Sequence, residues 1–360
     1  MVPSVGHSDL SPAVRTQGPI LLNGRAAARP RVTGVERWTA ELLPRLTALA
    51  PARYAAIVPP SRAGSGGLGQ AWEQLVLPAQ AARRRASLIF SPANLAPLLW
   101  PRNVVMLHDA AALREPSAYS RTYSAWHRRV GVQCARGALR VLTVSEFSRR
   151  ELIELAGLDP DKLVVIRGGV HERFRPTADH ERVAHKLGLS RPYVLTVATD
   201  DRRKNLSVLT HTARRLRTLG VELIWAGDTR PYITRARSIE SVRALGYVDE
   251  EDLAGLYRGA LAFVLPSRYE GLGLPCLEAM ACGTPVVAAN RAALPETCGA
   301  AALLVDPDDA DAVAEAVMRA TGDEALRLRL REAGLRRAGE RTWQRAAQEV
   351  DAVLSSLVDR

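Results

Sequence analysis

Short runs of aliphatic residues recur along this chain, and longer amphipathic segments separate them. Apolar runs bounded by Gly and Pro are typical of buried strands in a parallel sheet, which the intervening helices cover. The runs form two successive series, so the sequence predicts two α/β domains. The first series is GPILLNG (18–24), YAAIVPP (54–60), SLIFSPA (87–93), NVVMLHD (103–109), RVLTVSE (140–146) and KLVVIRG (162–168); the second is YVLTVAT (193–199), VELIWAG (221–227), VRALGYV (242–248), LAFVLPS (261–267), TPVVAA (284–289) and AALLVDP (301–307).

The boundary between the two series lies in a polar, glycine-rich stretch. Because this stretch also contains Pro176, it predicts a linker near residues 168–176. Residues 61–70, SRAGSGGLGQ, are too rich in Gly and Ser for a core element and predict a loop inside the first domain. A length of 360 residues agrees with two domains, because single cores rarely grow that large.

The net charge of +11 is concentrated in the first half. Residues 1–172 hold 22 Lys and Arg against 12 Asp and Glu, whereas residues 173–360 hold 27 against 26. Such a basic surface attracts polyanions, either nucleic acid or an anionic membrane. The alternative is a set of solvated helix faces in a chain that uses arginine freely.

No apolar run approaches the roughly 18 residues that a membrane-spanning helix requires, and the opening residues lack the apolar block of a signal peptide. These patterns predict a cytoplasmic protein. The four cysteines show neither paired metal-ligand spacing nor the framework of a disulfide-bonded scaffold, so we interpret them as small packing residues. They are Cys134, Cys276, Cys282 and Cys298.

The stretch SRYEGLGLPCLEAMACGTPVVAA, at 267–289, predicts one βαβ unit. Pro275 suits the first position of a helix, where its missing N–H has no partner to lose, and Gly283 suits a left-handed cap at the helix end. Ligands bind at the carboxyl ends of such strands, and the free N–H groups of a helix N-terminus receive anions. Gly271 and Gly273 permit close approach of the backbone, so a diphosphate or a hydroxyl-rich group fits here.

Two carboxylates flank this turn. We place Glu270 in the loop that faces the ligand cleft and Glu278 in the first turn of the helix. Both can accept hydrogen bonds from hydroxyl groups such as those of a sugar ring and a ribose. For Glu278 the alternative is helix stabilisation, because an acidic residue in the first turn interacts favourably with the helix dipole.

The spacing of Glu270 and Glu278, followed by AMACGTPVVAANRAALPE, resembles the signature of the retaining glycosyltransferases of family 4, also called group 1. Within that family the chain is most similar to the bacterial mannosyl- and rhamnosyltransferase-like subgroup. The resemblance covers nearly the whole chain, through an ordered series of further blocks. These blocks are NGRAAARPRVTGVERWTAELLPRL, VVMLHDA, VLTVSEFSRREL, YVLTVATDDRRKNL, LGYVDEEDLAGLYRGALAFVLPS and TWQRAAQEV.

The resemblance implies a GT-B fold, in which two Rossmann-like parallel-sheet domains face a central cleft. Residues 1–171 would form the acceptor-side domain, 172–341 the nucleotide-sugar domain, and 342–360 a helix that packs back toward the first domain. The resemblance also implies roles for single residues. Arg203 and Lys204 would bind the donor diphosphate, the loop at Gly34 would approach it, Glu278 would bind the ribose, and the backbone near Val248 would contact the nucleobase. Glu270 and the amides of Gly271, Leu272 and Gly273 would contact the transferred sugar and its phosphate, and His108 would face that sugar.

The chemistry needs these residue types. As the bond from sugar to phosphate breaks, the sugar gains oxocarbenium-like charge and the departing diphosphate gathers negative charge. Fixed cations and aligned amides stabilise that leaving group and can replace a metal ion. Apart from short acidic pairs such as Asp200 and Asp201, no carboxylate cluster suits Mg²⁺. Members of this family type are metal-independent, so we predict neither a metal nor a cofactor.

Three positions require separate comment. Many relatives carry an arginine where this chain has Ala198 and Thr199, and Arg202 is the residue expected to compensate. His108 follows an apolar strand, where ligand contacts gather, although a lone histidine there is often structural. Asp109 serves either the ligand or the start of the following helix.

The sequence therefore predicts a retaining hexosyltransferase that uses a nucleotide-sugar donor, with GDP-mannose as the expected donor. The expected acceptor is a lipid-linked or saccharide molecule of cell-envelope polysaccharide or glycoconjugate synthesis. The basic first domain would dock on the anionic inner face of the plasma membrane, and nucleic acid is not an expected partner. The alternatives are a scaffold with a degenerate sugar site that binds membrane or nucleic acid, and a GT-B sugar-nucleotide epimerase or hydrolase. A dehydrogenase is disfavoured, because the first βα turn lacks the G-x-G-x-x-G fingerprint.

Overall fold

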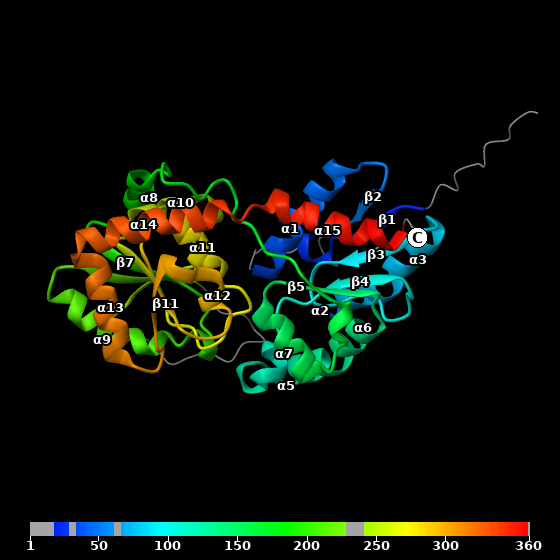
Figure 1. The fold of residues 1–360 in the computed structure, drawn as a ribbon, viewed down its shortest axis with the longest axis horizontal. Helices are drawn as coiled ribbons and strands as arrows, with labels where there is room; N and C mark the ends of the chain where they lie inside the picture. Colours follow the sequence, from blue (N-terminus) through cyan, green and yellow to red (C-terminus); the bar gives the residue numbers. More distant parts are fainter. Residues whose placement is uncertain (1–17, 29–33, 61–65, 228–240, 359–360) are drawn as a thin grey trace, which may run out of the picture.

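The structure is a computed structural model that describes residues 18–28, 34–60, 66–227 and 241–358. Figure 1 shows two α/β halves side by side, each with a central sheet and helices around it. The last helix, drawn in red, lies across the half that begins the chain.

The first sheet has six strands in the described residues, and every neighbouring pair is parallel. All six match the first predicted series of apolar runs. Across the sheet their order is β2 (Tyr54–Ile57), β1 (Ile20–Asn23), β3 (Leu88–Ser91), β4 (Asn103–Met106), β5 (Arg140–Thr143) and β6 (Leu163–Val165). The helical segments of this half are η1 (Arg25–Ala28), α1 (Gly34–Leu49), α2 (Gly66–Ala71), η3 (Trp72–Val76), α3 (Leu77–Arg83), α4 (Ala111–Arg114), η4 (Pro116–Ala118), α5 (Arg121–Trp126), η5 (His127–Gly131), α6 (Val132–Gly137), α7 (Glu146–Ala156) and η6 (Pro160–Lys162).

The second sheet also has six parallel strands in the described residues, and they match the second predicted series. Their order is β12 (Ala302–Val305), β11 (Val286–Ala289), β10 (Ala262–Leu265), β7 (Tyr193–Val197), β8 (Glu222–Ala226) and β9 (Arg243–Gly246). The helical segments are α8 (His180–Leu187), η7 (Arg202–Lys204), η8 (Leu206–Val208), α9 (Leu209–Arg217), α10 (Glu250–Gly259), α11 (Leu274–Ala281), α12 (Leu294–Cys298), η9 (Gly299–Ala301), α13 (Ala310–Gly322) and α14 (Glu324–Gly339).

The central strands are apolar without alternation because helices cover both faces of each sheet. All four residues of β10 have no exposed surface, and β1 is buried along its whole length. This is the pattern of a doubly covered parallel sheet, whose strands bury both sets of side chains. The order of strands reverses between β1 and β3 in the first sheet and between β7 and β10 in the second. Ligands of open α/β sheets bind at such switch points, beyond the carboxyl ends of the strands.

The chain passes between the two halves twice, and the two passages lie together. Val170, between β6 and α8, donates its backbone N–H to Arg341 O at 2.9 Å and forms a parallel bridge with Thr342. After the second passage, helix α15 (Trp343–Val358) packs against α1, where the rings of Trp343 and Trp38 meet edge to face with centroids 4.9 Å apart. The buried face of α15 is thus part of the core of the first half.

One sequence prediction about the first half is wrong. The stretch 61–70 was predicted as a loop, but residues from Gly66 onward are helical and continue without a break into η3 and α3. Residues 61–65 lie outside the described part. The apolar residues that follow, from Ala71 to Leu77, anchor this helical segment: Trp72 and Leu77 are buried in a small core with Leu21. The glycine content predicted a loop, but the packing of Trp72 and Leu77 stabilises a helix that extends back to Gly66.

The four cysteines are all buried and free, which confirms their interpretation as packing residues. Within the ranges that the structure describes, no helix is both long enough and apolar enough to cross a membrane.

Candidate active site

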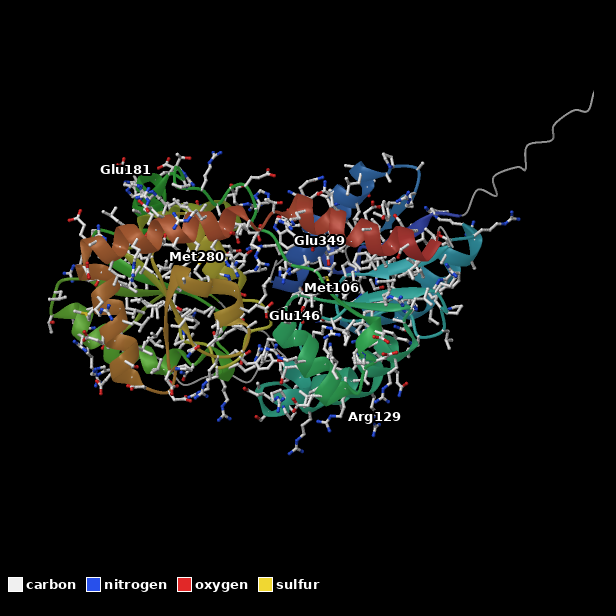
Figure 2. All side chains as sticks on the ribbon, in the orientation of Figure 1. Met106, Arg129, Glu146, Glu181, Met280 and Glu349 are labelled. Atoms are coloured by element: carbon white, nitrogen blue, oxygen red, sulfur yellow. The ribbon has the colours of Figure 1, made fainter. Side chains whose placement is uncertain are left out.

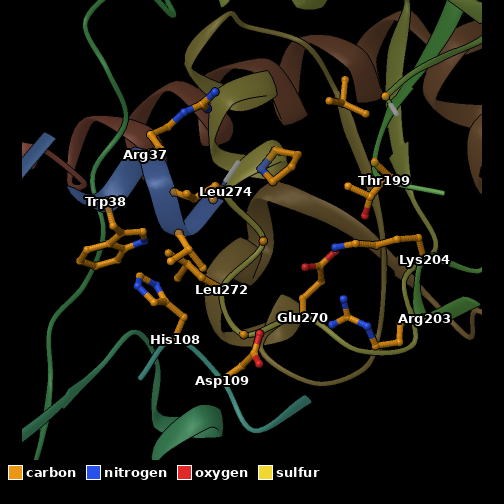
Figure 3. Close-up of a pocket in the computed structure, with 18 of the residues that line it drawn as sticks. Arg37, Trp38, His108, Asp109, Thr199, Arg203, Lys204, Glu270, Leu272 and Leu274 are labelled. Carbon is orange, nitrogen blue, oxygen red and sulfur yellow. The ribbon is translucent and has the colours of Figure 1, made fainter. Parts of the chain in front are cut away.

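A cavity of about 360 Å³ opens between the two halves, at the carboxyl ends of both sheets. Its lining includes residues that follow β3, β4, β7 and β10, and three of these strands, β3, β7 and β10, border the two switch points. Figure 3 shows side chains from both halves converging on it. All ten positions predicted from the sequence line this cavity: Gly34, His108, Arg203, Lys204, Val248, Glu270, Gly271, Leu272, Gly273 and Glu278.

The loop from Glu270 to Gly273 forms one wall of the cavity and leads into α11. Gly273 is the cap residue, with φ of +87°, a left-handed conformation that glycine adopts without strain. Gly271 faces the first half so closely that a Cβ there would lie 2.6 Å from His108 O. A side chain at either position would therefore cause strain or a clash, which explains the two glycines. Helix α11 presents its N-terminal end to the cavity.

Glu278 is not in the first helical turn, as the sequence had predicted. Helix α11 begins at Leu274, so Glu278 is its fifth residue, and no acidic side chain lies in the first turn. An interaction with the helix dipole falls off within that turn, so dipole stabilisation does not explain this buried carboxylate. Its partners are other side chains: Tyr257 OH donates to Oε2 at 3.0 Å, and Arg37 forms an ion pair with Oε1.

Arg37 reaches from α1 in the first half to two carboxylates of the second. Besides Glu278 it pairs with Glu250, at 2.7 Å, and Arg173 pairs with the other oxygen of Glu250 at 2.9 Å. Charges of opposite sign thus alternate from Arg173 through Glu250 and Arg37 to Glu278, and the last two line the cavity. These ion pairs link α1 of the first half to the second half.

Lys204 and Glu270 both line the cavity, and Figure 3 shows their side chains pointing toward one another. Lys204 Nζ lies 2.7 Å from Glu270 Oε1, and their side chains are only 15% and 11% exposed. An ammonium group has three hydrogens to donate, and Glu270 is the one partner that the described contacts give it. The ammonium group therefore retains donor capacity for an anion in the cavity.

Arg203 lines the cavity, but its guanidinium group is engaged by its own domain. It donates to Asp201 Oδ2 from Nε at 2.9 Å and from Nη2 at 2.5 Å. From the first half, the ring of Tyr119 lies 5.1 Å from the Arg203 guanidinium carbon, within cation–π distance. Arg202, the residue expected to compensate for a missing arginine, is exposed and is not part of the cavity lining. That expectation is therefore wrong.

His108 is buried on the opposite wall, with its ring edge to face against Trp38 at a centroid distance of 5.5 Å. Burial lowers the pKa of this imidazole below its usual 6.5, so the ring is neutral at pH 7. Its Nε2 lies 2.8 Å from Pro92 O, and because a carbonyl only accepts, Nε2 carries the proton. Nδ1 is then the atom with a lone pair for a hydroxyl group. Asp109, beside it, accepts from the first N–H of α4, that of Ala111, at 2.9 Å, although the cap residue of this helix is Ala110, and Asp109 also lines the cavity.

Sequence reasoning missed several residues of the lining, and three of them have side chains suited to binding a nucleotide sugar. They are Arg37, Tyr119 and Tyr247. Arg37 stands one helical turn after Gly34, and that spacing was available as a signal, since residues three apart on a helix share a face. Tyr247 directly precedes Val248, which was predicted to contact a nucleobase. Tyr119 reaches the cavity only through the packing of α4, η4 and α5, so no local pattern marks it.

In the described ranges, no three His, Cys, Asp or Glu side chains gather closely enough to hold a metal ion. Metal independence itself stays a prediction.

Two family models match the chain, one in each half. Residues 32–174 match the model described as Glycosyltransferase Family 4, and residues 191–323 match the one described as Glycosyl transferases group 1. Together they cover most of the two described sheets.

Among curated proteins, the chain is similar to O-antigen chain mannosyltransferase B of Escherichia coli, with 33% identity over 256 residues. That match covers 68% of this chain and 67% of the relative. It is also similar to the MMP alpha-(1->4)-mannosyltransferase of Mycolicibacterium hassiacum, with 32% identity over 250 residues, covering 65% of this chain and 59% of the relative.

Solved structures share the fold at lower identity. Sucrose-phosphate synthase from Thermosynechococcus elongatus superposes with a TM-score of 0.73 at 23% identity, covering 94% of this chain and 99% of that one. Anabaena HepE in complex with UDP-glucose gives a TM-score of 0.72 at 20% identity, covering 94% and 100%. With two parallel sheets that face a shared cavity, and with these relatives, the chain belongs to the family 4, or group 1, glycosyltransferases and has the GT-B fold.

Proposed function

We propose that this protein is a retaining mannosyltransferase that moves mannose from GDP-mannose to a lipid-linked or saccharide acceptor, in the synthesis of cell-envelope polysaccharide or glycoconjugate. The observation that carries the proposal is the meeting of Lys204 with the loop Glu270–Gly273 inside the cavity between the domains. A cation and a helix N-terminus together suit the diphosphate of a nucleotide sugar.

The leaving group is the nucleoside diphosphate. When the bond from the anomeric carbon to the phosphate oxygen breaks, negative charge grows on the diphosphate and positive charge on the sugar. Lys204 donates from the hydrogens that Glu270 does not use, and the N–H groups of Leu272 and Gly273 supply further donors. Removal of one such fixed donor costs about 3 to 4 kcal/mol in other enzymes, so a few of them account for a large share of a rate enhancement.

The carboxylate of Glu278 and the imidazole of His108 serve hydroxyl groups at the two ends of the donor. Glu278 accepts from the ribose hydroxyls and keeps its bond from Tyr257, while the ribose takes the place of Arg37. At the other end, Nδ1 of the neutral His108 ring accepts a hydroxyl hydrogen of the transferred sugar, and Nε2 stays bound to Pro92.

The charges of the lining explain why Arg37 would leave Glu278 when the nucleotide sugar binds. Three cations line the cavity and so do three carboxylates, so the lining has no excess positive charge for a diphosphate. Once the ribose occupies Glu278, Arg37 is released toward the phosphates, and the balance around the diphosphate becomes positive. The three cations are Arg37, Arg203 and Lys204, and the three carboxylates are Asp109, Glu270 and Glu278.

The choice of sugar has independent support, since both curated relatives are named for mannose transfer. The guanine base, the retention of configuration and the absence of a metal come from the family resemblance. The HepE structure carries UDP-glucose, so uridine nucleotides belong in any test of the donor.

The test is a thermal-shift screen of the purified protein, without metal, against GDP, UDP, ADP and dTDP and their common sugars. We expect a rise in melting temperature with GDP-mannose above that with the other sugars, and loss of the rise in Glu278→Ala. Product analysis by NMR then reads the anomeric configuration. Stabilisation by a different nucleotide would refute GDP-mannose. Absence of any shift would favour the scaffold, and sugar release or epimerisation without transfer would favour the hydrolase or epimerase.

We further propose that the first domain docks on an anionic membrane to reach a lipid-linked acceptor. Three leucines on neighbouring segments are exposed: Leu75 (69%), Leu98 (45%) and Leu99 (88%). Gln74 joins these segments, because its side chain donates to Ala96 O at 3.0 Å and accepts from Leu98 N at 2.9 Å. The loop also contacts α6 through Cys134 Sγ, 3.0 Å from Ala96 O.

Basic side chains lie on the segment that precedes α6, the helix in contact with this loop. Arg128 and Arg129 are exposed on η5, the segment that directly precedes α6, and Figure 2 shows Arg129 pointing outward from the molecule. Apolar insertion combined with about 1 kcal/mol per basic residue favours an anionic bilayer. Co-sedimentation with liposomes tests this. We expect binding to vesicles with anionic lipid, weakened by Leu99→Ser and by Arg129→Glu, and equal binding to neutral vesicles would refute the proposal.

A further inference from the structure

The start of helix α7, in the first domain, touches the loop 270–273 of the second. Ser145, which is fully buried, donates from Oγ to Gly271 O at 2.6 Å, and its Oγ also accepts from Ser148 N at 3.0 Å as the cap of α7. Ser148 Oγ lies 3.2 Å from Gly271 O and 3.2 Å from His108 O. One loop carbonyl of the second domain is therefore held by two hydroxyl groups of the first.

A carboxylate of the second domain completes this contact. Glu296 accepts from two free amides at the start of α7, those of Glu146 at 3.0 Å and Phe147 at 3.1 Å. An anion at this end of a helix is stabilised by the unpaired N–H groups and the dipole. Figure 2 shows Glu146 at the boundary between the two halves. The neighbouring residue, Thr297, donates its hydroxyl to Leu272 O.

These contacts fix the direction of two loop amides. In a planar trans peptide the carbonyl of one residue and the N–H of the next point in opposite directions. With Gly271 O held by Ser145, the N–H of Leu272 points away from the first domain's serines; with Leu272 O held by Thr297, the N–H of Gly273 points away from α12. Neither N–H has an acceptor among the described hydrogen bonds, and both residues line the cavity.

We infer that Ser145 is a positioning residue, supported by Ser148 and Glu296, which orients the amides of Leu272 and Gly273 toward the donor phosphate only when the two domains are closed. The inference rests on the proposed function. Because the contact crosses between domains, it links closure to the geometry that stabilises the leaving group, and it leaves the nucleoside part of the site unchanged. A misplacement of about 1 Å in such groups can lower a rate about 10²-fold.

The experiment compares Ser145→Ala and Ser148→Ala with wild type. For both variants we expect kcat for sugar transfer to fall about 10- to 100-fold, while the Kd for the nucleoside monophosphate, which lacks the phosphate next to the sugar, changes less than about 2-fold. Ser148→Ala keeps the cap of α7, so it separates orientation of the loop from helix stability. Asp323→Ala is the matched control, because it removes the cap of α14, where Asp323 accepts from Leu326 N at 3.0 Å, far from the cavity.

Three results would overturn the inference, and they are distinct. If Ser145→Ala and Ser148→Ala turn over the donor as fast as Asp323→Ala, the serines only stabilise the fold and the inference alone fails. If the wild-type protein transfers sugar from no donor in the nucleotide-sugar panel, the proposed function fails and takes the inference with it. A parallel loss of nucleoside monophosphate binding would also contradict it, because that loss would mean general damage to the site.

Discussion

The pair formed by Lys204 and Glu270 allows a stability role to be separated from a catalytic one. Lys204→Met removes the ammonium group and keeps most of the aliphatic stem. It leaves the Glu270 carboxylate, 11% exposed, without the cation that lies 2.7 Å away. Breaking a buried ion pair from one side costs about 3 to 5 kcal/mol, and the residual exposure of this pair favours the lower end. For a domain of this size, about 3 kcal/mol lowers the melting temperature by about 6 to 12 °C.

The catalytic effect adds to this loss. If Lys204 stabilises the departing diphosphate, its removal lowers kcat about 10²- to 10³-fold. The double variant Lys204→Met, Glu270→Gln has no unpaired carboxylate, so its melting temperature should return to within a few degrees of wild type. Its turnover should nevertheless stay at least about 10²-fold below that of Glu270→Gln alone. Calorimetry and a coupled nucleotide-release assay measure the two quantities. If turnover recovers together with stability, Lys204 serves only as the counter-ion of Glu270, and the reasoning is refuted.

Three further predictions follow from other parts of the structure. Burial lowers the pKa of His108, so the unfolded chain binds a proton near pH 6.5 that the folded protein excludes, and the free energy of unfolding should decline as the pH falls below 6.5. Calorimetry from pH 7.5 to 5.5 should show a flatter decline in His108→Gln than in wild type, and equal slopes would contradict the assignment. Trp343→Ala, at a site 2% exposed, should cost about 3 to 5 kcal/mol by calorimetry, whereas Leu99→Ala, 88% exposed, should leave the melting temperature unchanged. Treatment with a chelator should leave donor turnover unaltered, and its loss would refute metal independence.

Local patterns in the sequence predicted the strands and the main site residues well. The apolar runs located central strands such as β1, β3, β10 and β11 because strands that are buried on both faces have no polar alternation to obscure them. The stretch around Glu270 was predicted as a turn before a helix because Pro275 suits the first position of a helix, and its glycines were predicted to let the backbone approach a ligand closely. The remaining error there, the depth of Glu278 in the helix, came from a start one residue earlier than expected.

Contacts between the domains could not be predicted in the same way. The ion pair of Arg37 with Glu278 joins residues 241 positions apart, and Ser145 with Gly271 joins residues 126 apart. No periodicity or spacing in the sequence indicates these contacts, because they depend on how the two folded domains pack against each other. Even the helical start at Gly66 escaped prediction for a related reason, since packing of Trp72 decides it.

The place of α15 has a consequence for the order in which the chain acquires its structure during synthesis. Trp38 and Leu42 are synthesised early, yet their core also contains Trp343, Ala346 and Val350, which leave the ribosome only after the whole second domain. Domains usually fold as they emerge, N-terminal first. Here we expect the second domain to fold while translation continues and the first to wait for α15. Proteolysis of stalled nascent chains can check this, because resistance of the first domain before Trp343 emerges would contradict it.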